Sequence, residues 1–170
     1  MERPLEHLYQ SLQKLIGLHR QLLDTVRMEH EALVNASVKD IQEAVLAKQA
    51  LVDAVAISEH ERQRHIAELS IIWKKPAREL TISNIIIAIQ GRDPKAAEQF
   101  RSAMNALTVL VKRVGEQNES NRMIVERSLG HLQEMKKNVL GEAKPRTETY
   151  GPKGHKQSST GGARFLSKEV

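Results

Sequence analysis

A regular series of apolar residues over positions 100–139 constrains this chain more than any other feature. Its members recur in alternating steps of four and three, the spacing of one face of a helix that packs along another helix. The series comprises Phe100, Met104, Leu107, Val111, Val114, Asn118, Asn121, Val125, Ser128, Leu132, Met135 and Val139. We therefore expect one long packing helix whose apolar face is interrupted by two asparagines.

The composition favours an all-α fold. Only 3% of the 170 residues are aromatic, and the apolar content is mostly Leu, Ile, Val, Ala and Met, as in helix bundles. The absence of cysteine excludes disulfides, thiolate catalysis and thiolate metal sites, and it fits a reducing compartment. The sequence has no apolar run long enough to span a membrane and no signal peptide at its start.

Start and stop signals predict four helices, at 4–36, 37–73, 84–90 and 94–140. Pro4 and Pro94 are favoured first-turn residues, Ser37-x-x-Asp40 resembles a capping box, and Pro76 ends the second helix. The short connection between the first two helices predicts an antiparallel hairpin. We expect an elongated antiparallel bundle or coiled coil of three long helices and one short helix over 1–142, with a flexible tail over 143–170.

Two of these helices carry specific packing expectations. The short 84–90 helix is apolar nearly all round, so we expect it to be buried as a plug at one end of the bundle. For the 37–73 helix, the same four-and-three spacing predicts a packing face of Ile41, Val45, Lys48, Val52, Val55, Glu59, Arg62, Ile66 and Leu69.

The lengths of the helices indicate that the two ends of the apolar series have different packing partners. A helix over 37–73 spans roughly 54 Å and one over 94–140 roughly 70 Å. If the long helix folds back along the shorter one, its partner ends near residue 128, and the last turns overhang or pack on something else. An overhanging apolar stripe is a natural docking surface. Alternatively, the helices are staggered and the stripe is ordinary core.

Polar residues on the packing faces suggest specific pairs. In a hairpin centred near residue 38, Glu29 faces Lys48, and we expect a partly buried ion pair that sets helix register. The alternative is a charged contact for a partner. Asn118 and Asn121 either form internal hydrogen bonds, to the short helix or to the 4–36 helix, or anchor a bound partner beside an apolar groove.

Most of the net charge lies in the tail. Residues 143–170 carry six Lys or Arg and two Glu, whereas the first 142 residues carry 20 basic and 19 acidic groups. The body is therefore nearly neutral and does not suggest a nucleic-acid surface. The tail is polar and predicted to be disordered until bound. Tyr150 in a glycine-rich segment and the Phe165–Leu166 pair are its recognition candidates, and the role of the latter pair is left open.

Nothing in the sequence predicts catalysis, a cofactor or a metal site. No nucleophile elbow, phosphate loop or dinucleotide fingerprint occurs. Among the seven histidines none forms a Glu-x-x-His pair and no two stand four apart. His60 and His65 are five apart, on different faces of the 37–73 helix. We therefore expect a protein that is not an enzyme and has no metal site.

Several motifs, in this order, resemble the FlgN-type flagellar export chaperones. They are Met28-Glu29-His30-Glu31-Ala32-Leu33, then Lys48 and Arg62, then Asn118-Glu-Ser-Asn121, and finally Thr149-Tyr150-Gly151-Pro152-Lys153-Gly154. The resemblance covers nearly the whole chain, and the tail motif is its best single piece.

The resemblance implies a cytosolic chaperone that binds the C-terminal helices of hook-filament junction (hook-associated) proteins, prevents their premature assembly and delivers them to the type III export gate. It implies client contacts at Asn118, Asn121, Val125, Leu129, Leu132, Met135 and Val139, and export-gate contacts at Tyr150, Gly151 and Gly154. The alternatives are a basic-tailed adaptor that binds nucleic acid or an anionic membrane, and a structural homodimer. The expected partners include no nucleic acid and no integral membrane segment, and a homodimer is left open.

Overall fold

The structure, a computed structural model, describes residues 3–140. Its elements are α1 (Arg3–Val34), α2 (Val38–Trp73), a 3-10 turn η1 (Ala77–Glu79), α3 (Ile82–Gln90) and α4 (Pro94–Leu140). The described residues contain no strand, so the predicted all-α class with three long helices and one short helix is confirmed. None of the described helices is long and apolar enough to cross a membrane.

The chain divides into two compact units, Met1–Ser128 and Leu129–Val170, which are described separately here. The first holds α1, α2, α3 and α4 as far as Ser128. The described part of the second is the helical segment 129–140. The domain boundary expected after residue 142 lies outside the described residues and stays a prediction.

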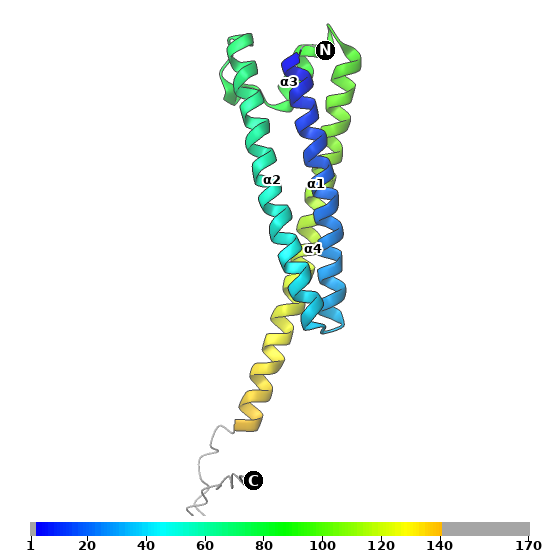
Figure 1. Cartoon of the computed structure of the whole chain (residues 1–170), viewed down its shortest axis with the longest axis vertical. Helices are drawn as coiled ribbons and strands as arrows, with labels where there is room; N and C mark the ends of the chain where they lie inside the picture. Colours follow the sequence, from blue (N-terminus) through cyan, green and yellow to red (C-terminus); the bar gives the residue numbers. More distant parts are fainter. Residues whose placement is uncertain (1–2, 141–170) are drawn as a thin grey trace, which may run out of the picture. The chain divides into compact units, whose positions relative to one another are not determined.

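In the first unit, α1 and α2 form the expected antiparallel hairpin (Figure 1). Ala36 makes the tight turn possible with a φ of 51°, in the left-handed region that non-glycine residues seldom adopt. Ser37 precedes α2 as expected, but its hydroxyl donates to Asp40 Oδ2 at 2.7 Å and caps no backbone N–H. The helix therefore begins where the capping-box pattern placed it, without the backbone hydrogen bond of that motif.

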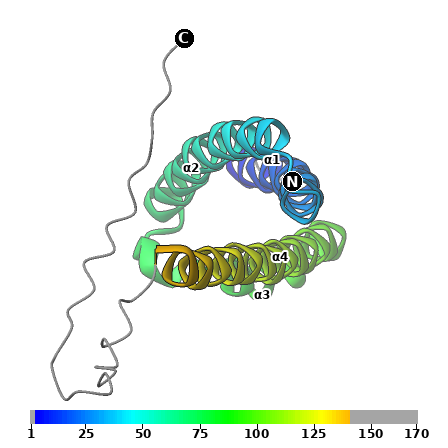
Figure 2. The same cartoon turned by 90° about the horizontal axis from the view of Figure 1, so that it is seen from below.

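Within the same unit, α4 runs parallel to α1. Tyr9 meets Phe100 edge to face with 5.6 Å between ring centroids, and His30 is hydrogen-bonded to Asn121. Both pairs are 91 residues apart, and a constant offset between contacts at the two ends requires helices that run in the same direction. Figure 2 shows this part of α4 facing the α1–α2 pair.

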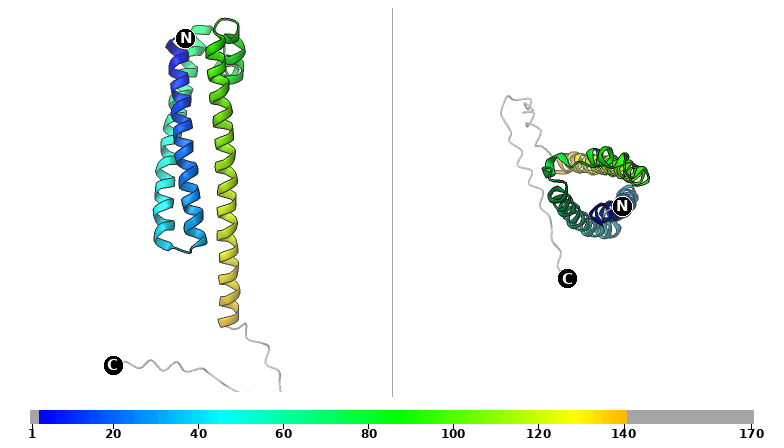
Figure 3. Two further views of the ribbon diagram at one scale, coloured as in Figure 1. Left: turned by 90° about the vertical axis from the view of Figure 1, so that its right-hand side faces the viewer. Right: turned by 90° about the horizontal axis from the view of Figure 1, so that it is seen from above.

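The main core lies where α3 meets the start of α4 and the open end of the hairpin (Figure 3). Thr81 caps α3 by accepting a hydrogen bond from the Asn84 N–H at 3.2 Å. We expected this short helix to be a plug buried nearly all round. Instead, only one face of α3 is buried, and Ile87 is exposed. A nine-residue helix that lies on a bundle end buries only the face in contact. The core consists of Leu5, Leu8, Leu12, Ile16, Leu69, Leu80, Ile85, Ile86, Ile89, Ala96, Ala97, Phe100 and Ala103.

The packing face of α2 agrees with the expected one except at two valines: its other members, Ile41, Lys48, Val55, Glu59, Arg62, Ile66 and Leu69, are buried or half-buried. Val45 and Val52 are exposed, whereas Ala44 and Ser58 are buried. The two buried residues are small and lie outside the expected series. The four-and-three pattern alone could not reveal this, because it ranks positions by hydrophobicity rather than by the space between the helices.

Candidate functional site

A cluster of polar side chains joins α1, α2 and α4 inside the first unit. We call Glu29, His30, Lys48 and Asn121 the central polar cluster. Lys48 Nζ lies 2.5 Å from Glu29 Oε1 and 2.7 Å from Oε2, so the two residues paired from the sequence do form an ion pair. The Glu29 side chain is 9% exposed and that of Lys48 27%. Because a carboxylate this buried needs compensation, the ammonium group of Lys48 is essential to the arrangement.

Asn121 completes the cluster from α4. Its Nδ2 donates to the Val26 carbonyl at 2.9 Å and to Glu29 Oε2 at 3.0 Å. Its Oδ1 lies 2.8 Å from His30 Nδ1, which places the His30 proton on that nitrogen. Asn121 is only 4% exposed. The internal alternative, with hydrogen bonds to the first helix, therefore describes Asn121, and its assignment as a client contact is corrected.

Asn118 lies one turn before Asn121 and behaves differently. It is half-buried, and its side chain has no hydrogen bond within the described part of the chain. The two asparagines of the motif are therefore not equivalent: Asn121 joins helices, while Asn118 remains available.

Arg62, another residue of the family motif, pairs along its own helix. Its guanidinium donates to both oxygens of Glu59, with Nε 2.8 Å from Oε2. This hydrogen bonding lowers the pKa of Glu59, against the opposing effect of burial. His19 of α1 adds a smaller lowering of the same pKa. The pair thus provides a fixed acidic group on the α1 side of α2.

The residues expected to contact a client are exposed apart from the two asparagines. Val125, Leu129, Leu132, Met135 and Val139, which we call the 125–139 stripe, range from 40% to 81% exposed. Val125 belongs to the first unit, which ends at Ser128, and the other four belong to the second unit. Every described residue from 125 onward is exposed. Such a run of apolar side chains in one helix is the type of surface that binds another protein.

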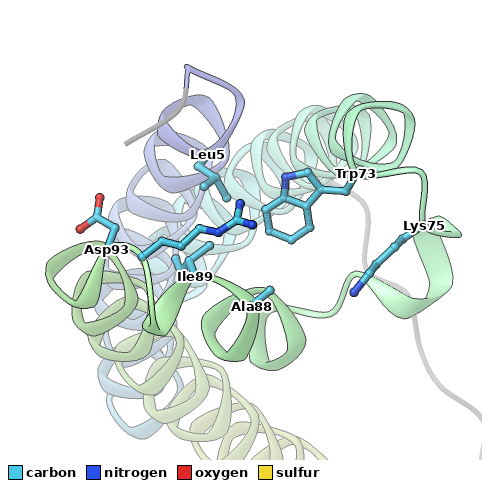
Figure 4. Close-up of a pocket in the computed structure, with 7 residues that line it drawn as sticks. Leu5, Trp73, Lys75, Ala88, Ile89 and Asp93 are labelled. Atoms are coloured by element: carbon cyan, nitrogen blue, oxygen red, sulfur yellow. The ribbon is translucent and has the colours of Figure 1, made fainter.

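The sequence analysis did not anticipate a cleft of about 790 Å³ at the α3 end of the first unit. Figure 4 shows the Trp73 indole extending from α2 toward Leu5 and Ile89, with Lys75 and Asp93 on opposite sides. The Asp93 carboxylate accepts the Ala96 N–H at 2.9 Å, which lowers the pKa of Asp93. Trp73, the single tryptophan of the chain, was the signal that could have pointed to this cleft.

Tyr150, Gly151 and Gly154, expected at the export gate, lie outside the described residues, as do Phe165 and Leu166. Their roles stay predictions.

The comparisons with known proteins agree with the resemblance noted from the motifs. The model of the family described as FlgN protein matches residues 1–158. No curated protein and no solved structure matches the chain.

Proposed function

Because the chain belongs to the FlgN family of flagellar export chaperones, we propose that it binds the C-terminal helices of hook-filament junction proteins, prevents their premature assembly and delivers them to the export gate. The exposed 125–139 stripe is the observation that carries this proposal. A client whose assembly surface is a pair of amphipathic helices needs an apolar helix as a substitute partner, and the stripe offers one.

The composition of the stripe suits reversible binding. Met135 is flexible and adapts to different apolar partners, while the intervening positions other than Gly130 are polar or charged, including Glu134 and Lys136. A chaperone must release its client, so a small apolar surface in a polar setting is preferable to an extensive one. Asn118 borders the stripe and is the asparagine retained as a client contact.

Two other parts of the protein are each assigned one task. The first unit, with its core and central polar cluster, keeps the chaperone folded. The segment around Tyr150, Gly151 and Gly154 is proposed to contact the export gate, so that the protein reaches a second partner while it holds the first. This proposal places the protein in the cytoplasm.

A pair of double substitutions tests the client surface. Leu132→Asp with Met135→Asp should abolish capture of a purified hook-filament junction protein, because two carboxylates would be buried in an apolar contact. The control, Ile71→Asp with Ile72→Asp, alters two exposed apolar residues of α2 and should leave capture unchanged. An equal loss of capture in both variants, or no loss of capture in the Leu132→Asp, Met135→Asp variant, contradicts the assignment of the stripe as the client surface.

Two further measurements separate the other readings. Capture through apolar contacts should persist at high salt, whereas a tail that binds phosphates or anionic lipids would lose affinity steeply. A structural homodimer would dissociate in the Leu132→Asp, Met135→Asp variant, as measured by light-scattering chromatography, and client capture would be unaffected.

For the export gate, Tyr150→Ala should retain client capture and lose export. Loss of both client capture and export would contradict a separate gate-binding role for Tyr150.

A further inference from the structure

The α1–α2 hairpin brings together three potential metal ligands near its open end. His7 belongs to α1, and His65 and Glu68 belong to α2; one ligand atom from each lies within 4.8 Å of the other two. The two imidazole rings have centroids 5.6 Å apart and are tilted by 46°. We propose that His7, His65 and Glu68 bind a divalent transition-metal ion of the Zn²⁺ type, independently of client binding.

The separations are close to those that a tetrahedral ion requires. Bonds of about 2.1 Å at tetrahedral angles place two ligand atoms about 3.4 Å apart. His65 Nδ1 and Glu68 Oε2 are already 3.5 Å apart, because residues three apart share a helix face. His7 is exposed, so rotation about its side-chain bonds can supply the remaining approach across the hairpin.

The ligand set selects the class of metal. Two imidazoles and one carboxylate match three-ligand zinc sites, which leave a fourth position for water. Nitrogen ligands also suit Co²⁺, Ni²⁺ and Cu²⁺, whereas Mg²⁺ and Ca²⁺ prefer oxygen throughout. A cavity of about 330 Å³ lined partly by His7 and His65 has room for the ion and its water.

The neighbouring charges do not oppose a cation strongly. Lys14 of α1 lines the same cavity, but its Nζ lies 2.7 Å from Glu61 Oε2 and is thereby compensated. On α2, Arg64 Nε lies 3.6 Å from Glu68 Oε1, while the other oxygen, Oε2, is the one near His65. Glu68 can therefore keep this weak pairing and still offer one oxygen to the metal.

A bound ion would join α1 to α2 at the end of the hairpin opposite the Ala36 turn. Ligands that are 58 positions apart in sequence, His7 and His65, meet only in the folded chain. An ion that binds the folded state and not the unfolded one raises the thermal midpoint in proportion to the logarithm of its concentration. The site is thus a potential brace of the hairpin.

Titration calorimetry with ZnCl₂ on full-length protein without a histidine tag tests the site. The expected result is one ion per chain, at least about tenfold weaker binding by His7→Gln and by His65→Gln, and a smaller loss for Glu68→Gln. Co²⁺ should give the visible absorption of a four-coordinate ion, and Zn²⁺ should raise the thermal midpoint of the unaltered protein. Circular dichroism checks that each variant remains helical.

The matched control is His131→Gln. His131 has the same spacing to Glu134, with 3.9 Å between Nδ1 and Oε2, but no third ligand joins them among the described residues. This variant should bind Zn²⁺ as the unaltered protein does. The proposal is overturned if the unaltered protein binds no Zn²⁺, or if His7→Gln and His65→Gln bind it with unchanged affinity.

Discussion

Asn121 of α4 donates a hydrogen bond to the carboxylate of Glu29 on α1, with 3.0 Å between Nδ2 and Oε2. The same carboxylate receives Lys48 from α2, so one buried acidic group connects all three long helices of the first unit. Hydrogen bonds have directional requirements that apolar contacts lack. This cluster therefore accounts for the register of α4 against the hairpin better than the surrounding aliphatic residues do.

Asn121→Ala should lower the free energy of unfolding by about 2 kcal/mol. The substitution removes one hydrogen bond each from the Val26 carbonyl and the Glu29 carboxylate and leaves His30 Nδ1 without its acceptor, and such losses cost about 1–3 kcal/mol. Urea denaturation followed by circular dichroism measures the change. Asn118→Ala is the control and should change stability by less than about 0.5 kcal/mol; equal effects would contradict the different roles of the two asparagines.

Lys48→Met should destabilise the protein by about 2 kcal/mol. It leaves the buried Glu29 carboxylate without its cation, but Lys48 is partly exposed, so the effect should fall below the 3–5 kcal/mol of fully buried pairs. Glu29→Gln in the same background should restore part of the loss, because the uncompensated charge is removed. A double-mutant cycle by urea denaturation measures this coupling, and strictly additive effects would argue against the pair.

Ser58→Ala should stabilise the protein by up to about 1 kcal/mol. Ser58 is fully buried, and its hydroxyl has no hydrogen-bond partner within the described residues, a situation that costs free energy. Ser11 provides the matched comparison, since its buried hydroxyl donates to the Leu8 carbonyl at 2.7 Å. Thermal denaturation should show a higher midpoint for Ser58→Ala and no gain for Ser11→Ala.

Arg62→Met should change how stability depends on acidity. Arg62 lowers the pKa of Glu59 below its usual 4.5, so the folded state binds the Glu59 proton less readily than the unfolded state does. The pair therefore stabilises the protein above the unfolded pKa, and this contribution disappears as the pH falls through the lower folded pKa.

Urea denaturation at about pH 7 and about pH 3 measures this effect, which should stay below about 1 kcal/mol because Glu59 is partly exposed. Arg62→Met should be less stable than the unaltered protein at the higher pH, with a smaller deficit at the lower one. Arg64→Met removes a more exposed guanidinium of the same helix and should show little change at either pH. A deficit for Arg62→Met that grows in acid would contradict the assigned pairing.

The periodic spacing of Leu, Ile and Val and the Pro, Gly and Ser signals between helices were sufficient to predict the all-α class, the four helices and the hairpin. The pairing of Glu29 with Lys48 also followed from sequence, because positions equally distant from a tight turn face each other in an antiparallel hairpin. These are consequences of local geometry and of short connections, which a single chain displays directly.

Only the tertiary structure decided which faces are used and which distant residues meet. The burial of Asn121 depends on α4 lying parallel to α1 at a constant offset. The exposure of Val45 and Val52 and the burial of Ala44 and Ser58 also became visible only in the packed helices. Likewise, His65 and Glu68 share one face of α2, but His7 becomes their neighbour only across the hairpin. Sequence period determines that a helix has an apolar face; the space between packed helices determines which side chains fill it.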